Sequence, residues 1–385
     1  MTLHQTVEIA KKVLLGMVLG LAGIVILVLF FRFGIILKNL IFPPPTLPAN
    51  HLYGTLKPIN FPPSVTNAKL TYTINTVTGA LPDFPERVNV FPIVQPQPNL
   101  LDLNKARTKA VNVGFVDGNN NVLPEKALDS TLYQWDEPKD LQRKLIINTL
   151  TTDFSLKSNF LSSSAILEAP GALTIDQTVS TVVDFLNHIG FVQSDLDMSK
   201  VTNPNQEISY FRTPQLLAIQ NGALVPTSSL STTQIIRVDL YQKDLEYDLN
   251  TGIPELAGGY KTIKMQIPIL YPNPPYSTMS FWVAAGQLSP QVVAAEFAHK
   301  NIDTSAAEAA TYSIKTATEA FDELKEGKAY IASYTGPNTN IAIKNAYLTY
   351  YVGKNNEPYL MPVIAFTDDN GFFAYVSAVK NEWVK

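Results

Sequence analysis

The sequence contains no cysteine among its 385 residues. This absence excludes disulfide bonds, zinc sites built on thiolates and cysteine nucleophiles. It also excludes a lipoprotein anchor, because there is no cysteine to carry the lipid. Whatever stabilises this chain or attaches it to a membrane must use other chemistry.

Charged side chains are also scarce, at 16% of the residues against a usual ~25%. The net charge is −4 at pH 7, and the lysines and arginines form no cluster. A surface that binds nucleic acid normally gathers such residues on one face, so nucleic acid is not expected as a partner. With 46% hydrophobic residues, the chain has enough apolar material for a large core.

Motifs for catalysis and metal binding are missing as well. There is no Gly-x-Ser-x-Gly of serine hydrolases, no phosphate-binding loop and no dinucleotide-binding glycine pattern. The four histidines include no pair three or four residues apart, so no metal pair is indicated: His4, His51, His188 and His299. We expect the last two near helix C-termini, where an imidazole meets the helix dipole favourably. We therefore predict a protein that is not an enzyme and that has no metal or cofactor.

One long apolar run dominates the N-terminal region. Residues 13–31 carry no charged or strongly polar side chain, and as a helix they would span ~28 Å, close to the ~30 Å hydrocarbon core of a bilayer. We predict a transmembrane anchor over residues 13–37, preceded by a cytoplasmic stub at 1–12. A signal peptide is the alternative, but its apolar core is usually about 7–15 residues and ends at a small-residue cleavage site, which this run lacks.

The flanking charges do not decide the orientation, because Lys11 and Lys12 precede the run while Arg32 and Lys38 follow it. A short stub before the helix and a large folded region after it are usual for a signal anchor. The predicted location is therefore the cell membrane, with a single pass and the C-terminal region outside the cytoplasm.

Prolines are dense in residues 38–63, which include Pro43, Pro44 and Pro45. Such a composition favours an extended polyproline conformation and predicts a spacer between the bilayer and the folded region. The alternative is that these prolines only border the first strand.

Two amphipathic helices are predicted in the first folded region, residues 64–200, after a strand at 70–77. They cover 102–113 and 176–189, and a Gly-Phe pair ends each of them. Four apolar positions coincide when the helices are aligned on those glycines. The coincidence is typical of an internal duplication, although chance could also produce it.

A β-rich middle region is predicted at residues 201–289, with a hairpin at Asn221-Gly222 and strands at 234–241, 262–271 and 279–284. We assign residues 290–385 to a C-terminal unit of a helix followed by three strands. A helix is expected at 290–299, and a second begins at a capping box of Thr316 and Glu319. The resulting fold class is α+β: an N-terminal transmembrane helix, then antiparallel sheets with helices packed on one face in tandem helix-plus-meander units.

The aromatic-rich segment 271–282 is the candidate partner-binding surface. Exposed Tyr and Trp are common anchors in interfaces and in grooves for peptides or carbohydrates. The alternative is that these rings cap the sheet core beside a proline turn. The candidate residues are Tyr271, Tyr276, Phe281 and Trp282.

The C-terminal unit consists of AFDELKEG followed by NAYLTYYV, YLMPVIAF and GFFAYVSAV. In this order it resembles PepSY-like domains, and in particular the membrane-anchored YycH/YycI-type regulators of cell-envelope signalling. The resemblance covers residues 310–380; the middle section, 200–290, departs from it. It implies an extracytoplasmic binding or regulatory module that contacts another membrane protein or a wall component.

Taken together, these features predict a single-pass, non-enzymatic binding or regulatory protein of the bacterial cell envelope. Its expected partners are membrane lipid, through the N-terminal helix, and an envelope protein or cell-wall component. The main alternative is a structural component of a surface or secretion assembly. An envelope hydrolase would require converging carboxylates, or a serine with a base, in the folded protein.

Overall fold

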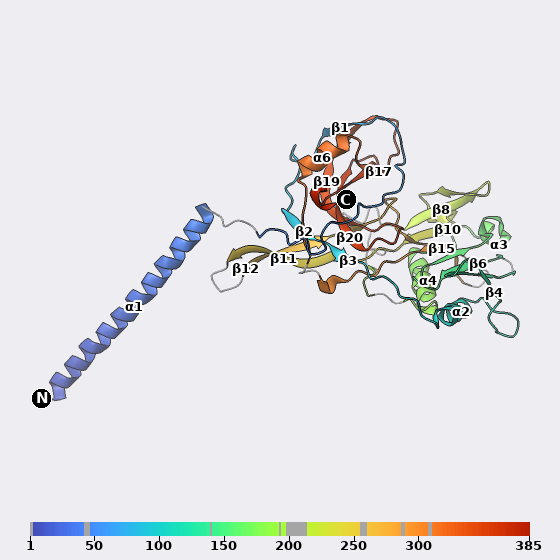
Figure 1. Cartoon of the computed structure of the whole chain (residues 1–385). Coiled ribbons are helices and arrows are strands. Elements are labelled where there is room, and N and C mark those ends of the chain that lie inside the picture. Colours follow the sequence, from blue (N-terminus) through green and yellow to red (C-terminus); the bar gives the residue numbers. More distant parts are fainter. Residues whose placement is uncertain are drawn as a thin grey trace. The chain divides into compact units, whose positions relative to one another are not determined.

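The computed structural model describes residues 3–41, 47–138, 141–191, 194–197, 214–254, 260–285, 289–306 and 310–385. The chain divides into two compact units. Residues 1–48 and 247–265 form the first, and residues 49–246 and 266–385 form the second (Figure 1).

The first unit holds the N-terminal helix, α1, which covers Leu3–Ile41. Its stretch Leu14–Ile35 has a mean hydropathy of 2.9, and none of it is buried. The coarse part of the anchor prediction is therefore confirmed: the chain has a helix long and apolar enough to cross a membrane, a property that signal sequences share. The helix also extends beyond the predicted bounds 13–37 at both ends. A separate two-stranded sheet consists of β11 (Leu245–Pro254) and β12 (Tyr260–Ile267).

A nine-stranded sheet, antiparallel throughout, builds one half of the second unit. Strands far apart in the sequence meet at its centre, where β7 pairs with β15. In spatial order its strands are β4 (Glu125–Ala127), β5 (Leu132–Asp136), β6 (Lys144–Asn148), β7 (Phe154–Lys157), β15 (Gln291–Phe297), β14 (Met279–Ala284), β10 (Ile235–Asp239), β8 (Gln215–Gln220) and β9 (Ala223–Pro226).

The two predicted helices are confirmed as α2 (Asp102–Asn112) and α4 (Ile175–His188). They end in the same way. Gly114 and Gly190 have φ of +90° and +70°, and the next amide, Phe115 or Phe191, donates to the carbonyl five residues earlier. Lys109 Nζ donates to Ile189 O at 2.7 Å, so the two helix ends are neighbours (Figure 1). The shared ending is consistent with duplication, which stays a prediction.

One face of the nine-stranded sheet is covered by α4, which contacts β10, β14 and β15. The Phe185 ring of α4 lies 6.0 Å from Phe154 and 6.1 Å from Phe281. Short helical turns complete this half: α3 (Ser164–Leu167) and the 3-10 turns Phe160–Ser162 and Leu230–Thr232.

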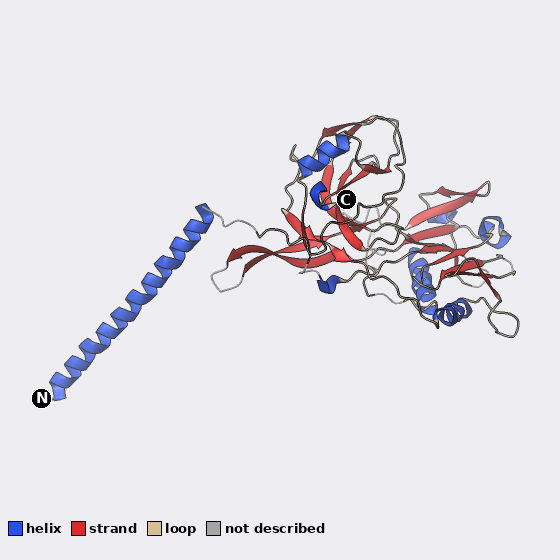
Figure 2. Ribbon diagram, in the orientation of Figure 1, coloured by secondary structure: helices blue, strands red, loops and turns tan. Residues whose placement is uncertain are grey.

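A six-stranded sheet builds the other half (Figure 2). The predicted meander is confirmed as antiparallel β19, β20 and β21, and the sequence analysis missed β17 beside it. Its strands are β13 (Ile269–Leu270), β19 (Asn345–Tyr351), β20 (Tyr359–Thr367), β21 (Phe373–Ser377) and β17 (Tyr330–Ser333), with β3 (Phe91–Pro92) pairing with β20. Two small sheets pair β1 (Thr71–Ile74) with β18 (Asn340–Ile343), and β2 (Arg87–Asn89) with β16 (Thr311–Ser313).

The capping box is confirmed at the start of α6 (Ala317–Lys325), where Thr316 and Glu319 exchange hydrogen bonds. The helix packs on the six-stranded sheet, with the Phe321 and Phe366 ring centroids 5.9 Å apart. Two further 3-10 turns lie at Thr304–Ala306 and Asn381–Trp383. The fold class, an apolar N-terminal helix followed by mostly antiparallel sheets in an α+β arrangement, is thus confirmed.

Two predictions about segments are wrong. Residues 290–299 are not a helix but the strand β15, because β14 and β7 hydrogen-bond to it on both sides and bury Val293 and Ala295 completely. The predicted boundary at 290 therefore cuts through the nine-stranded sheet. His299 accordingly follows a strand rather than a helix.

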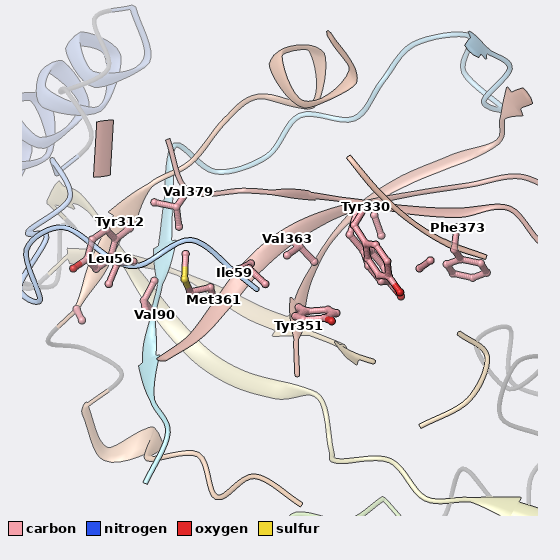
Figure 3. Packing of buried hydrophobic residues seen from close by; sticks show 14 residues of the cluster. Leu56, Ile59, Val90, Tyr312, Tyr330, Tyr351, Met361, Val363, Phe373 and Val379 are labelled. Carbon is pink, nitrogen blue, oxygen red and sulfur yellow. The ribbon is translucent and has the colours of Figure 1, made fainter. Parts of the chain in front are cut away.

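The spacer prediction for 38–63 is also wrong for its described second half. Leu56 is only 1% exposed and joins the core of the six-stranded sheet (Figure 3). Its amide donates to Trp383 O at 2.8 Å, and its carbonyl accepts from Lys385 N at 2.9 Å. Ile59 belongs to the same buried cluster. Residues 49–63 are thus part of the folded unit; residues 42–46, with the three consecutive prolines, lie outside the described residues.

Glu357, just before β20 of the six-stranded sheet, contacts the segment 49–63: its Oε1 accepts a hydrogen bond from Asn60 N at 3.1 Å. Burial raises the pKa of the Glu357 carboxyl above 4.5, against the lowering effects of the Asn60 N–H and the Lys300 charge. A raised carboxyl pKa means that this group favours folding most below the unfolded-state pKa. Stability is then lost as the pH rises through the folded-state pKa.

Glu357→Gln keeps an oxygen for Asn60 and removes the titrating proton. We expect the variant to have a higher free energy of unfolding than the wild type at about pH 7, and to lose that advantage at about pH 4. Urea titrations at the two pH values measure this difference. A difference that does not change with pH would contradict the assignment.

Candidate functional site

Two of the four candidate partner-binding residues are buried. Phe281 is fully buried because its side of β14 faces α4, where its ring meets Phe185. Tyr271 is 2% exposed, and its hydroxyl accepts a hydrogen bond from Gln242 N at 3.0 Å. For this pair the alternative holds: the rings complete the core.

The other two candidates, Tyr276 and Trp282, are half-buried and hold an arginine between them. The Arg237 guanidinium carbon lies 3.8 Å from the Tyr276 ring centroid and 4.8 Å from that of Trp282. The same guanidinium donates to both Asp239 carboxylate oxygens at 2.9 Å and to Ser280 Oγ at 2.9 Å. Stacking and pairing together fix this arginine in one position.

Arg237 lines a cleft of about 620 Å³, which we call the Arg237 cleft. Lining residues such as Ile146, Ser155 and Glu296 alternate with buried residues along their strands, which places most of the cleft on the side of the nine-stranded sheet opposite Phe281. Phe154 and Phe297 of the core also border it. Asp153 also lines it, and burial raises the pKa of that carboxyl despite hydrogen bonds from Thr151 and the His299 amide and the nearby Lys300 charge. The other lining residues include Ile146, Ser155, Ser280, Trp282, Glu296 and Lys354.

A second cleft of about 810 Å³ is more apolar, and we call it the apolar cleft. One wall is a face of the six-stranded sheet, where Tyr347 of β19 and Phe373 of β21 lie. The loop 76–82 forms another wall and includes the fully exposed Val77. Prolines contribute much of the remaining surface: Pro82, Pro268, Pro274 and Pro275. Polar groups are few and include Gln266, Lys344 and Asn345.

The segment 271–276 contributes to both clefts. Pro272 and Asn273 line the Arg237 cleft. Tyr271, Pro274 and Pro275 line the apolar cleft, and Tyr276 lines both. The sequence analysis therefore selected the segment that borders both clefts, although half of its candidate side chains are in the core. It missed Arg237 and Tyr347. Arg237 alternates with buried residues along β10, which marks the open face of the sheet.

His299 belongs to a buried polar cluster beside the Arg237 cleft. Its Nε2 lies 2.9 Å from Asp195 Oδ2, which also accepts from Gln242 Nε2 at 2.9 Å. Burial acts to raise the pKa of Asp195, but its hydrogen bonds and the His299 charge outweigh burial and lower it.

The remaining histidine contacts are structural. His188 Nδ1 lies 2.6 Å from Asp184 O, and His51 stacks on Trp383 with ring centroids 3.6 Å apart. Within the described residues, no group of three His, Asp or Glu side chains could hold a metal ion.

Comparison with known proteins yields little. No protein-family model matches the chain, and no curated protein matches it. A crystal structure of an uncharacterized protein from Eubacterium rectale ATCC 33656 resembles 82% of this chain and 90% of its own, with 10% identity and a TM-score of 0.34. A likeness at that TM-score carries no argument about fold or function.

Proposed function

We propose that this chain is a single-pass, membrane-anchored binding protein of the bacterial cell envelope, with its folded region outside the cytoplasm and no enzymatic role. In this proposal the apolar cleft takes an extended apolar segment of another envelope protein. The observation that carries the proposal is the cleft of about 810 Å³ walled by prolines and tyrosines beside a face of the six-stranded sheet.

The chemistry of the cleft favours an extended peptide. Grooves lined by aromatic rings accept proline-containing and other extended segments, because such segments lose little conformational entropy on binding. Tyr347 and Tyr276 offer large ring faces with a polar end, which suits this mode of recognition. Gln266 and Asn345 supply amide groups for the main chain of the bound segment.

Two further features support the proposal. An uncleaved α1 would hold the protein at the membrane, where envelope proteins are concentrated. The sequence of residues 310–380 resembles PepSY-like domains, and this resemblance implies a binding or regulatory role rather than catalysis.

A structural component of a surface assembly is the second candidate. The motivating feature is β9 (Ala223–Pro226), which lies at one edge of the nine-stranded sheet and pairs with β8 there. Edge strands can add a neighbouring chain. Size measurement of the detergent-solubilised full chain separates the two: a monomer supports the binding protein, whereas a ring or filament supports the assembly component.

Photocrosslinking tests the cleft directly. With p-benzoylphenylalanine at Tyr347, we expect one discrete crosslinked protein in native membranes. The same probe at Tyr334, a half-buried tyrosine outside the cleft, should give none. Tyr347→Ser should then weaken binding of that partner by about 10- to 30-fold, as loss of an aromatic anchor usually does.

Tyr334→Ser is the matched control and should leave the affinity unchanged. Equal melting temperatures of the two variants would show that Tyr347→Ser acts through the cleft rather than through the fold. Equal crosslinking at the two positions, or full affinity in Tyr347→Ser, would contradict the proposal.

A further inference from the structure

One edge of β19 lacks a strand partner for most of its length. Its other edge pairs with β20 over the whole strand. On the edge away from β20, β13 pairs in parallel with Tyr350 and Tyr351 only, and Tyr350 N donates to Pro268 O at 2.9 Å. Pro268 has no N–H with which to extend this ladder. Within the described part of the chain, no strand pairs with residues 345–348 on this edge.

The strand β1 borders the same edge at its other end. Lys344 N donates to Thr367 O at 2.8 Å, although the register pairs Thr367 with Asn345. Two residues therefore face one, which is a β-bulge, and the Ile343 carbonyl just before it points away from β20. That carbonyl accepts from Asn75 N, next to β1, at 2.8 Å. The edge is thus paired with β1 before the bulge and with β13 at its far end, and it is open between them.

The apolar cleft lies along this open stretch. Its lining includes the five consecutive residues 344–348. Alternate side chains of a strand point to opposite faces of the sheet, so a cleft on one face alone would touch only every second residue. A cleft that touches all five borders the edge of the strand. Because Tyr350 N points to β13, the period of two directs the amides and carbonyls of Ala346 and Leu348 toward the same edge.

We propose that the apolar cleft binds its partner by strand addition. An extended segment of another envelope protein lies on β19 between β1 and β13 and pairs with the main chain of Ala346 and Leu348. This inference rests on the proposed function and specifies how the same cleft holds its occupant. Segments that add to a sheet edge gain affinity from main-chain hydrogen bonds and specificity from pockets for alternate side chains.

The surroundings of the edge fit such a strand. Main-chain donors and acceptors that alternate along an open edge are matched by those of another extended chain. On one face of the sheet, Asn345, Thr367 and Phe373 are in register across β19, β20 and β21, and all three line the cleft. Alternate side chains of the added strand would lie beside Asn345 and Tyr347, at the usual distance of cross-strand neighbours.

Removing one main-chain N–H of the edge tests the pairing. Full-length Ala346→Pro carries p-benzoylphenylalanine at Tyr347 and is crosslinked in native membranes. Edge strands tolerate proline where the lost N–H is not used within the sheet, so the melting temperature should change little. We expect the yield of the crosslinked partner to fall about 3- to 10-fold, the effect of one lost hydrogen bond.

Ala342→Pro is the matched control. The alternation that directs the Ile343 carbonyl toward β1 directs the Ala342 N–H toward the opposite edge, and Ala342 does not line the cleft. This variant should leave the yield of the crosslink at Tyr347 unchanged. Equal yields in the two proline variants would overturn strand addition.

Alternate N-methylation makes the same test on the unaltered protein. The segment recovered with the Tyr347 crosslink is synthesised as a peptide in two forms, each methylated on one alternate set of its amides. A strand directs only one such set toward its neighbour, so one form should bind at least ~10-fold more weakly in a fluorescence titration and the other should bind like the unmethylated peptide.

The outcomes separate this inference from the proposed function. Equal affinities of the two methylated forms overturn strand addition, while a discrete crosslink at Tyr347 still supports the cleft. A crosslinked partner that proves to be a second copy of this chain overturns the assignment of the occupant. No crosslink at Tyr347 in the wild-type background contradicts the proposed function, and the inference with it.

Discussion

Glu323→Ala is expected to lower the free energy of unfolding by about 3 kcal/mol, because it leaves a buried lysine without its counter-ion. Lys315 has a side chain only 5% exposed, and its Nζ donates to Glu323 Oε2 at 2.9 Å and to Ser377 O at 3.0 Å. The other carboxylate oxygen accepts from Asn381 Nδ2 at 2.9 Å. The Glu323 carboxylate thus links α6 to Lys315, which precedes the helix, and to Asn381 near the C-terminus.

The size of the effect follows from the surroundings of the pair. Removing one partner of a buried ion pair usually costs about 3–5 kcal/mol. Glu323 is 17% exposed and borders a hollow of about 300 Å³, so water reaches part of the site and the lower end of that range applies. A loss of that size is a large part of the ~5–15 kcal/mol that stabilises most domains.

Asp322→Ala, one residue earlier on α6, is the matched control. Asp322 pairs with Lys325 at 2.7 Å, but both side chains are about half exposed, so its loss should cost no more than ~0.5 kcal/mol. Urea titration followed by tryptophan fluorescence compares them, since Trp383 reports from the same part of the fold. Replacing both partners, as Lys315→Met with Glu323→Leu, should recover most of the loss. If Glu323→Ala lowered the free energy of unfolding no more than Asp322→Ala does, the Lys315–Glu323 pair would contribute no more to stability than an exposed ion pair.

Local sequence patterns correctly predicted the helices and strands whose conformation depends mainly on their own residues. The helices α2 and α4 follow from apolar spacing and a terminating glycine, and β14 (Met279–Ala284) has the bounds predicted from its sequence. The helix prediction for residues 290–299 failed because their alanines favour a helix locally, whereas the flanking strands β14 and β7 impose an extended chain. The partner β7 is distant in the sequence, so no window around residue 290 contains this information.

The two clefts could not be predicted from the sequence. The apolar cleft is lined by residues 76–82 and by β19, which are distant in the sequence, so no local pattern predicts that they border one cleft. Tyr271 and Tyr276 both line the apolar cleft, yet Tyr271 is only 2% exposed, whereas Tyr276 is half-buried and borders the Arg237 cleft as well. Aromatic content identified the segment, whereas only three-dimensional packing determined how far each ring is exposed.

Charged substitutions within the apolar stretch of α1 are expected to have the largest effect of those proposed. Leu21→Arg together with Leu27→Arg places two guanidinium groups inside the apolar stretch Leu14–Ile35. Each arginine near the centre of a membrane helix costs about 2.5–3.5 kcal/mol, so the pair should cost about 5–7 kcal/mol. We expect carbonate extraction to leave the wild type in the membrane pellet and to release most of the double variant.

Leu37→Arg is the control, because the same substitution two residues beyond the apolar stretch lies where an arginine can reach the interface. It should leave the pellet fraction unchanged. N-terminal sequencing of the wild type from the pellet distinguishes an anchor from a signal sequence: an anchor keeps residues 1–37, whereas cleavage would leave a chain that begins after them. A cleaved chain would contradict the proposed tether. The apolar cleft would then have to bind its partner without the high local concentration that a shared membrane provides.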